Sequence, residues 1–101
     1  VPTPPSYSTN DCGSPYDPND GSGVTCNEFS SWSQVAMCEE GGWGAYAEGP
    51  NFYGSLGLSS AAWDEFGSGI DRTAATPDQQ IVVAMRVSAD PPDQGGCNGG
   101  W

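Results

Sequence analysis

One acidic side chain, Glu39, falls at a position whose surroundings could make it a general acid. Trp32, Val35 and Ala36 stand at i, i+3 and i+4, so in a helix they share one apolar face. Glu39 is the next position on that face, three residues after Ala36 and four after Val35. A carboxylate at the end of a core-facing stripe loses solvation, which raises its pKa, and a Glu protonated near neutral pH is what a general acid requires. From this helix alone, the alternative that Glu39 ends the stripe and faces water stays open.

The helix that would carry Glu39 has a start signal and a stop signal. Ser31 followed by Gln34 matches a capping box, which predicts that the helix begins there. Gly41-Gly42 predicts its end. The preceding residues, 1–30, are rich in Pro, Ser, Asn and Asp and show no periodicity. We therefore expect a loop segment over 1–30 and a folded domain over 31–101.

Aromatic residues are concentrated in the segment that follows. Residues 43–58 are rich in Gly and have turn residues at 48–51, which predicts a short, irregular β-hairpin. The aromatic residues at 43, 46, 52 and 53 exceed what one small core needs. Stacking on sugar rings and plain core packing are both open interpretations of these side chains.

Two more helices are expected, each with a start signal. Ser59 predicts the N-cap of a short helix that ends at Gly67, with Trp63 on its apolar edge. The run Thr76-Pro-Asp-Gln79 combines an N-cap, a proline at the first helical position and a capping box, and predicts a third helix through to Asp90. The buried face of this helix is expected to comprise Ile81, Val82, Ala84, Met85 and Ala89. The elements together predict a small α+β domain of three short helices and one hairpin.

The four cysteines predict disulfides. The chain has 101 residues, no His and no Cys-x-x-Cys pair, which argues against a zinc site and leaves no predicted metal or cofactor. Four cysteines permit three pairings. We favour Cys12–Cys26 with Cys38–Cys97, since the second pair would tie the end of the first helix to the C-terminal segment. Disulfides also indicate an oxidising compartment and therefore a secreted protein.

The charge of the chain excludes several partners. Thirteen acidic residues stand against Arg72 and Arg86, which gives a net charge of −11. Such a surface repels phosphate backbones, so we expect no nucleic-acid binding, and it disfavours docking on anionic lipid. No apolar run is long enough to span a membrane. Without His or Lys, the common catalytic triads are also excluded.

Three blocks of the sequence resemble the transglycosylase-like domain of the actinobacterial resuscitation-promoting factors, a miniature lysozyme-like fold. The stretch 32–42, Trp-x-x-Val-Ala-x-Cys-Glu-x-Gly-Gly, looks like the helix of that family that carries Cys-Glu-x-Gly-Gly. Residues 53–67 resemble its hairpin and second helix, and residues 75–84 resemble its last helix. Cys97 looks like its closing cysteine. The blocks keep compatible spacing over about two thirds of the chain.

The resemblance implies a function and a set of functional residues. It implies cleavage of the β-1,4 bond between N-acetylmuramic acid and N-acetylglucosamine in peptidoglycan, with Glu39 rather than Glu40 as the single catalytic acid. This agrees with the helical phase of Glu39, and the family disulfide supports Cys38–Cys97. It also implies glycan strands as the binding partner, with a peptidoglycan endopeptidase as a candidate second partner, for a monomer at the cell wall. The expected substrate-binding residues are Trp43, Tyr46, Tyr53 and Trp63.

The sequence departs from the family where the glycan should run. Trp43-Gly44 replaces the usual Asn-Trp, one place out of step, while Gly57 and Leu58 replace the usual Gln and Phe. These departures leave two alternatives open. One is a non-catalytic glycan-binding or signalling module, and the other is a disulfide-stapled inhibitor or structural module that shares only the fold. Hydrolysis and anhydro-forming transglycosylation are equally compatible with the sequence.

Activity on peptidoglycan is expected to fall as the pH rises through the pKa of Glu39, because only the protonated carboxyl can donate to the glycosidic oxygen. The release of soluble muropeptides, measured between about pH 5 and about pH 9, checks this expectation. A rate that climbs steadily to about pH 9 would contradict a protonated Glu39.

Overall fold

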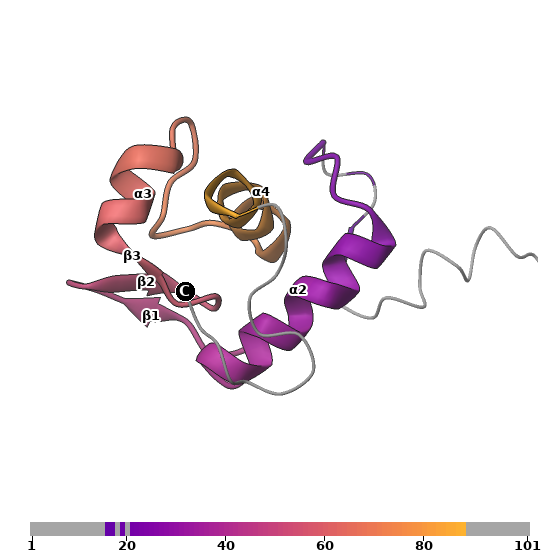
Figure 1. Cartoon of the computed structure of the whole chain (residues 1–101), viewed down its shortest axis with the longest axis horizontal. Helices are drawn as coiled ribbons and strands as arrows, with labels where there is room; N and C mark the ends of the chain where they lie inside the picture. The colour runs from indigo at the N-terminus through magenta and orange to yellow at the C-terminus, as the bar shows by residue number, and fades with distance from the viewer. Residues whose placement is uncertain (1–15, 18, 20, 89–101) are drawn as a thin grey trace, which may run out of the picture.

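The described residues form three helices and three short strands of a small α+β domain (Figure 1). The structure is a computed structural model, and it describes residues 16, 17, 19 and 21–88. In chain order the elements are α2 (Cys26–Glu39), β1 (Ala47–Glu48), β2 (Phe52–Gly54), β3 (Leu58–Ser59), α3 (Ser60–Phe66) and α4 (Pro77–Val87). The predicted fold class is therefore confirmed, apart from the disulfides. Among the described helices, none combines the length and the apolar run that a membrane crossing needs.

The first helix begins earlier than the sequence analysis predicted. Its N-cap is Thr25, whose Oγ1 accepts from the backbone N–H of Glu28 at 3.2 Å, while Glu28 Oε1 accepts from the N–H of Thr25 at 2.8 Å. This capping box satisfies backbone donors that a helix start leaves without intrahelical partners. The predicted start at Ser31 is wrong, because Ser31 and Gln34 both lie inside α2.

Burial of Phe29 explains the earlier start of α2. Phe29 lies three residues before Trp32, and both side chains are 1% exposed. The apolar face of the helix therefore continues one turn before Trp32, Val35 and Ala36, all of which are buried as predicted. Residues 26–30 are helical rather than loop, and the predicted division at residue 30 falls within α2.

The hairpin predicted over 43–58 is present and gains a third strand. The strand order is β1-β2-β3, and both pairs are antiparallel. Tyr53 lies at the centre of the sheet, opposite Glu48 on one side and Leu58 on the other. Strands of two or three residues form few ladder hydrogen bonds, so the sheet depends on the helices packed against it.

The second helix matches its prediction. Ser59 caps α3 by accepting from the backbone N–H of Ala62 at 3.1 Å, and Gly67 follows its last residue. Trp63 is buried and Phe66 is half-buried. Asp64 and Glu65 are exposed, as a one-sided apolar edge requires.

The third helix starts as predicted but ends earlier. Thr76 Oγ1 accepts from the N–H of Gln79 at 3.2 Å, and Gln79 Oε1 accepts from the N–H of Thr76 at 2.9 Å. Pro77 occupies the first turn. The predicted end at Asp90 is wrong, because α4 ends at Val87 and Ser88 is extended, with φ −147°. A β-branched residue followed by serine favours helix continuation only weakly. Ala89 and Asp90 lie outside the described residues.

The core lies where the helices meet the sheet. In Figure 1, α4 lies between α2 and α3, and it contacts both. The buried apolar residues are Val24, Phe29, Trp32, Val35, Ala36, Leu56, Leu58, Trp63, Ala75, Ile81, Val83 and Ala84. Of the predicted face of α4, Ile81 and Ala84 are buried and Val82 and Met85 are partly buried.

The helix bounds narrow the choice of disulfide pairing. Cys26 and Cys38 lie at opposite ends of α2, twelve residues apart (38 − 26), which at 1.5 Å per residue is about 18 Å. A disulfide needs Cα atoms within about 7 Å, so these two cannot pair with each other. Neither is a free thiol. Cys12 and Cys97 lie outside the described residues, so the pairing Cys12–Cys26 with Cys38–Cys97 stays a prediction.

Gln80, one of three buried polar residues in the described part of the chain with Ser55 and Asp78, is 2% exposed. Its Oε1 accepts from the backbone N–H of Ser55 at 2.6 Å, and its Nε2 donates to the carbonyl of Ala75 at 3.1 Å. A β-carbon on Gly54 would stand 2.6 Å from Gln80 Oε1, so the glycine is needed for this close approach. The Gln80 amide therefore joins α4 to the hairpin and to the loop before α4.

Replacing Gln80 with Leu is expected to lower the free energy of unfolding by about 2–4 kcal/mol, because a buried N–H and a buried carbonyl lose their partners while volume is nearly kept. Urea denaturation measures the change. The control is Glu65→Gln on the exposed side of α3, which is expected to stay within about 0.5 kcal/mol. A loss for Gln80→Leu as small as that of the control would contradict a structural role for the amide.

Candidate functional site

Glu39 is the last residue of α2, and its side chain is half-buried. Glu40 follows as the C-cap, and Gly41 and Gly42 have φ of 95° and 118°. The backbone N–H groups of both glycines bond the carbonyl of Ala36, at 3.1 and 3.0 Å. These bonds satisfy a carbonyl of the last turn and redirect the chain, so that Glu39 ends the buried face of the helix as predicted.

The turn between β2 and β3 lies directly against Glu39. A β-carbon built on Gly57 would stand 3.0 Å from Glu39 Oε1, 3.3 Å from its Cβ and 3.5 Å from its Cγ. Gly57 is buried and has a φ of 69°, in the left-handed region that favours glycine. The side chain of Glu39 therefore runs along the backbone of this turn from its Cβ to its carboxylate.

Hydrogen bonds of Ser55 and burial of Leu56 also hold this turn in place. The Ser55 N–H bonds Gln80 Oε1, and the Ser55 hydroxyl donates to the carbonyl of Ala45 at 2.5 Å. Leu56 is fully buried in the core. These contacts connect the candidate acid, through the turn, to α4 and to the loop that follows α2. Gln80 was not among the predicted site residues, although its position four residues before Ala84 places it on the buried face of α4.

Trp43 and Tyr46, two of the predicted substrate-binding residues, are engaged within the fold. Trp43 Nε1 donates to Ser33 Oγ at 2.8 Å, and its ring stacks on Phe29 with centroids 5.5 Å apart. The Tyr46 hydroxyl donates to the carbonyl of Arg72. Burial raises the pKa of Tyr46 above its usual value, so the phenol stays a donor. Both side chains are half-buried, and each has a structural role.

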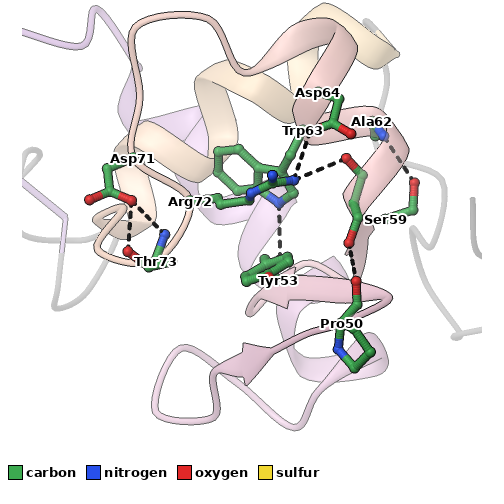
Figure 2. Close-up of polar contacts among 10 residues, drawn as sticks. Pro50, Tyr53, Ser59, Ala62, Trp63, Asp64, Asp71, Arg72 and Thr73 are labelled. Carbon is green, nitrogen blue, oxygen red and sulfur yellow. Dashed lines mark hydrogen bonds and ion pairs between the residues drawn. The ribbon is translucent and has the colours of Figure 1, made fainter.

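Tyr53 and Trp63, the other two, lie next to each other (Figure 2). Trp63 Nε1 donates to the carbonyl of Tyr53 at 3.2 Å, and Trp63 is 4% exposed. Tyr53 is half-buried. The burial of Trp63 leaves it little surface for a sugar ring, so the prediction of stacking at this residue finds no support in its surroundings.

Phe52 is an exposed aromatic residue that the site prediction omitted. It lies on β2 and is 51% exposed, whereas its neighbour Tyr53 is half-buried. Alternation along a strand gives this signal, since Phe52 and Tyr53 must point to opposite faces. Met37, which is 63% exposed, presents a second apolar side chain in the last turn of α2.

Arg72 connects three parts of the domain, and Figure 2 shows it between Asp64 and Tyr53. Its Nη1 lies 3.0 Å from Asp64 Oδ1 and donates to the carbonyl of Ser60 at 3.2 Å. Its Cζ stands 4.9 Å from the centre of the Tyr53 ring, within the range of a cation–π contact. The guanidinium therefore holds β2 and the start of α3 against the loop before α4.

A pocket of about 430 Å³ lies beside α3 and Arg72. Its lining residues are Trp63, Asp64, Gly67, Ser68, Ile70, Asp71 and Arg72. Hydrogen bonds from the hydroxyl and the backbone N–H of Thr73 lower the pKa of Asp71. Glu39 is not among the lining residues, and the contacts of Arg72 and Asp71 are internal to the fold, so we do not assign this pocket to the chemistry of Glu39.

Within the described part of the chain, no three His, Cys, Asp or Glu side chains come close enough to hold a metal ion together. What the described residues do bring together is a half-buried carboxylate at a helix end and a rigid turn that contacts it. Such an arrangement can hold a general acid in one position.

Comparison with known proteins gives one family. The model of the transglycosylase-like domain matches residues 26–98. Resuscitation-promoting factor RpfD of Mycobacterium tuberculosis is 45% identical over 56 residues, covering 55% of this chain and 36% of RpfD. RpfC of the same species is 43% identical over 60 residues, covering 59% and 43% of the two chains. Rpf2 of Corynebacterium glutamicum is 38% identical over 63 residues, covering 59% and 17%.

The matches cover only part of each relative. The aligned part of the chain spans less than half of the length of RpfD, RpfC and Rpf2. No solved structure matches the chain. The family match begins at Cys26, where α2 also begins.

Replacing Arg72 with Ala is expected to lower the free energy of unfolding by about 1–3 kcal/mol, since one change removes a charged hydrogen bond and a cation–π contact. Asp64→Asn is expected to cost less than about 1 kcal/mol, because the carboxylate is largely exposed. Thermal or urea unfolding of both variants measures the difference. Equal losses would mean that the ion pair alone accounts for the role of Arg72.

Proposed function

The chain belongs to the resuscitation-promoting factor family through its transglycosylase-like domain, and from this premise we propose that it cleaves the glycan strands of peptidoglycan. The bond would be the β-1,4 linkage between N-acetylmuramic acid and N-acetylglucosamine, with Glu39 as the catalytic acid. The observation that carries the proposal is the position of Glu39, half-buried at the end of α2 and packed against the turn at Gly57.

In the proposed reaction, the protonated carboxyl of Glu39 donates to the bridging oxygen as the sugar acquires oxocarbenium character. The bond between the anomeric carbon and that oxygen breaks, and the leaving sugar takes the proton as a hydroxyl. The partial burial of Glu39 supports this role, because loss of water favours the neutral acid. The contact with Gly57 supports it as well, because it restricts where the carboxyl can lie.

A single-acid route fits the described carboxylates better than a two-acid route. Most glycosidases use two carboxyl groups on either side of the bond. Here Asp64 pairs with Arg72, while Glu48 and Glu65 are exposed on β1 and α3. We propose that the N-acetyl group of the substrate stabilises the cation instead. Glu39, now a base, would then deprotonate either the 6-hydroxyl of the sugar, giving an anhydro product, or a water molecule.

The glycan contacts are part of the proposal. Phe52 offers the most exposed ring surface on the small sheet, and an exposed aromatic face can stack on a sugar ring. Trp43, Tyr46 and Tyr53 are half-buried and would contribute edges rather than whole faces. We also propose action outside the cell as a monomer at the wall. An endopeptidase partner stays a prediction.

Glu39→Gln is expected to lower the release of soluble muropeptides from purified peptidoglycan by about 10²–10⁴-fold, because the amide cannot donate the proton. Mass spectrometry of the released material measures the loss, and anhydro ends would identify transglycosylation. The matched control is Glu40→Gln, which removes the neighbouring carboxylate and is expected to keep activity within about threefold.

Three outcomes would count against this assignment in different ways. Equal release by wild type and Glu39→Gln would mean that another group is the acid. Loss in Glu40→Gln alone would move the assignment by one residue. No release by the wild type, together with binding of glycan strands that Glu39→Gln retains, would favour the glycan-binding module over the enzyme.

A further inference from the structure

We propose that Gly57 is a positioning residue for the Glu39 carboxylate, which it holds in place by presenting bare backbone to the side chain. The kinetic effect of this contact rests on the proposed function, whereas the contact itself does not.

The contact is tighter than a side chain at this position normally has with a neighbour. The built β-carbon of Gly57 lies 3.0 Å from Glu39 Oε1 and 3.3 Å from Glu39 Cβ, both inside an ordinary van der Waals distance. A third contact, 3.5 Å from Cγ, is ordinary. An added methyl group therefore meets Glu39 at two points along its length, and the carboxylate end is the closest.

The turn cannot move away to relieve that contact. Residues 54–58 are all buried. Ser55 is bonded to Gln80 at 2.6 Å and to the carbonyl of Ala45 at 2.5 Å, and Leu56 is fully buried. The Glu39 side chain is half-buried at a helix end, and it is the neighbour that the added methyl group would meet. A methyl group at 57 would therefore displace the carboxylate by a few tenths of an ångström rather than the backbone.

The expected kinetic effect follows from the sensitivity of proton transfer to geometry. A misplacement of about 1 Å can cost about 10²-fold, so a shift of a few tenths is expected to lower kcat about tenfold. Substrate contacts made by other residues are unchanged, so KM is expected to change less than about twofold.

The experiment compares Gly57→Ala with Gly69→Ala in muropeptide release. Gly69 is a matched control because its φ of 84° imposes the same backbone strain on alanine, while its built β-carbon meets nothing within 4 Å. The backbone strain of alanine should be similar in the two variants, so we expect the tenfold loss in kcat only for Gly57→Ala. Equal kcat values for the two variants would overturn the proposal.

A double-mutant cycle tests the geometry without any activity. Gly57→Ala is introduced into the wild type and into Glu39→Ala, which removes the Oε1 and Cγ contacts. The melting temperature is expected to fall about 2–4 °C more in the wild-type background. Equal falls in both backgrounds would overturn the proposed contact. A larger fall in melting temperature in the wild-type background, together with no muropeptide release by the wild type, would support the contact between Gly57 and Glu39 but reject the proposed enzymatic activity.

The cycle also decides the case in which Gly57→Ala does not fold. If Gly69→Ala and the double variant Glu39→Ala, Gly57→Ala both fold, the strain lies between Glu39 and residue 57, as proposed. If the double variant also fails, the strain lies in the backbone of the turn and the proposal is rejected.

Discussion

The buried amide of Gln80 is the interaction on which the arrangement of this small domain depends. The strands are two or three residues long, so the few hydrogen bonds between them are too weak to stabilise the sheet alone. Gln80 fixes the position of the strands, because its buried amide accepts from Ser55 and donates to Ala75 while only 2% exposed to solvent. Breaking a buried pair leaves both groups without partners, so the cost of moving the hairpin is large relative to the few contacts within it.

Signals that are local in sequence were predicted well. The ends of α3 and the start of α4 depend on side chains within three residues of the backbone groups that they cap, so Ser59, Thr76 and Gln79 suffice to place them. The start of α2 was misplaced because two matches to the same capping pattern occur six residues apart. Only the burial of Phe29, a tertiary effect, selects Thr25 over Ser31.

Contacts between distant segments could be predicted only in part. Helical phase placed Glu39 at the end of the buried face, which is correct, but no pattern indicates that Gly57 lies against it eighteen positions later (57 − 39). Likewise, the number of aromatic residues suggested a surface that stacks on sugar rings, but it could not tell which side chains pack in the core and which are exposed. Trp63 is buried in the core, and Trp43 stacks on Phe29 and bonds Ser33. Phe52 is exposed on the surface.

The placement of the two arginines has a consequence for how the molecule would move over a polyanionic matrix. Arg72 donates to the carbonyl of Ser60, and Arg86 donates to the carbonyls of Phe66 and Ser68. With no lysine in the chain, the basic side chains are both committed to the backbone of α3 and its following loop. The two arginines are also outnumbered by thirteen acidic residues, so at long range a polyanionic matrix repels the chain, and any hold on that matrix would come from short-range contacts alone.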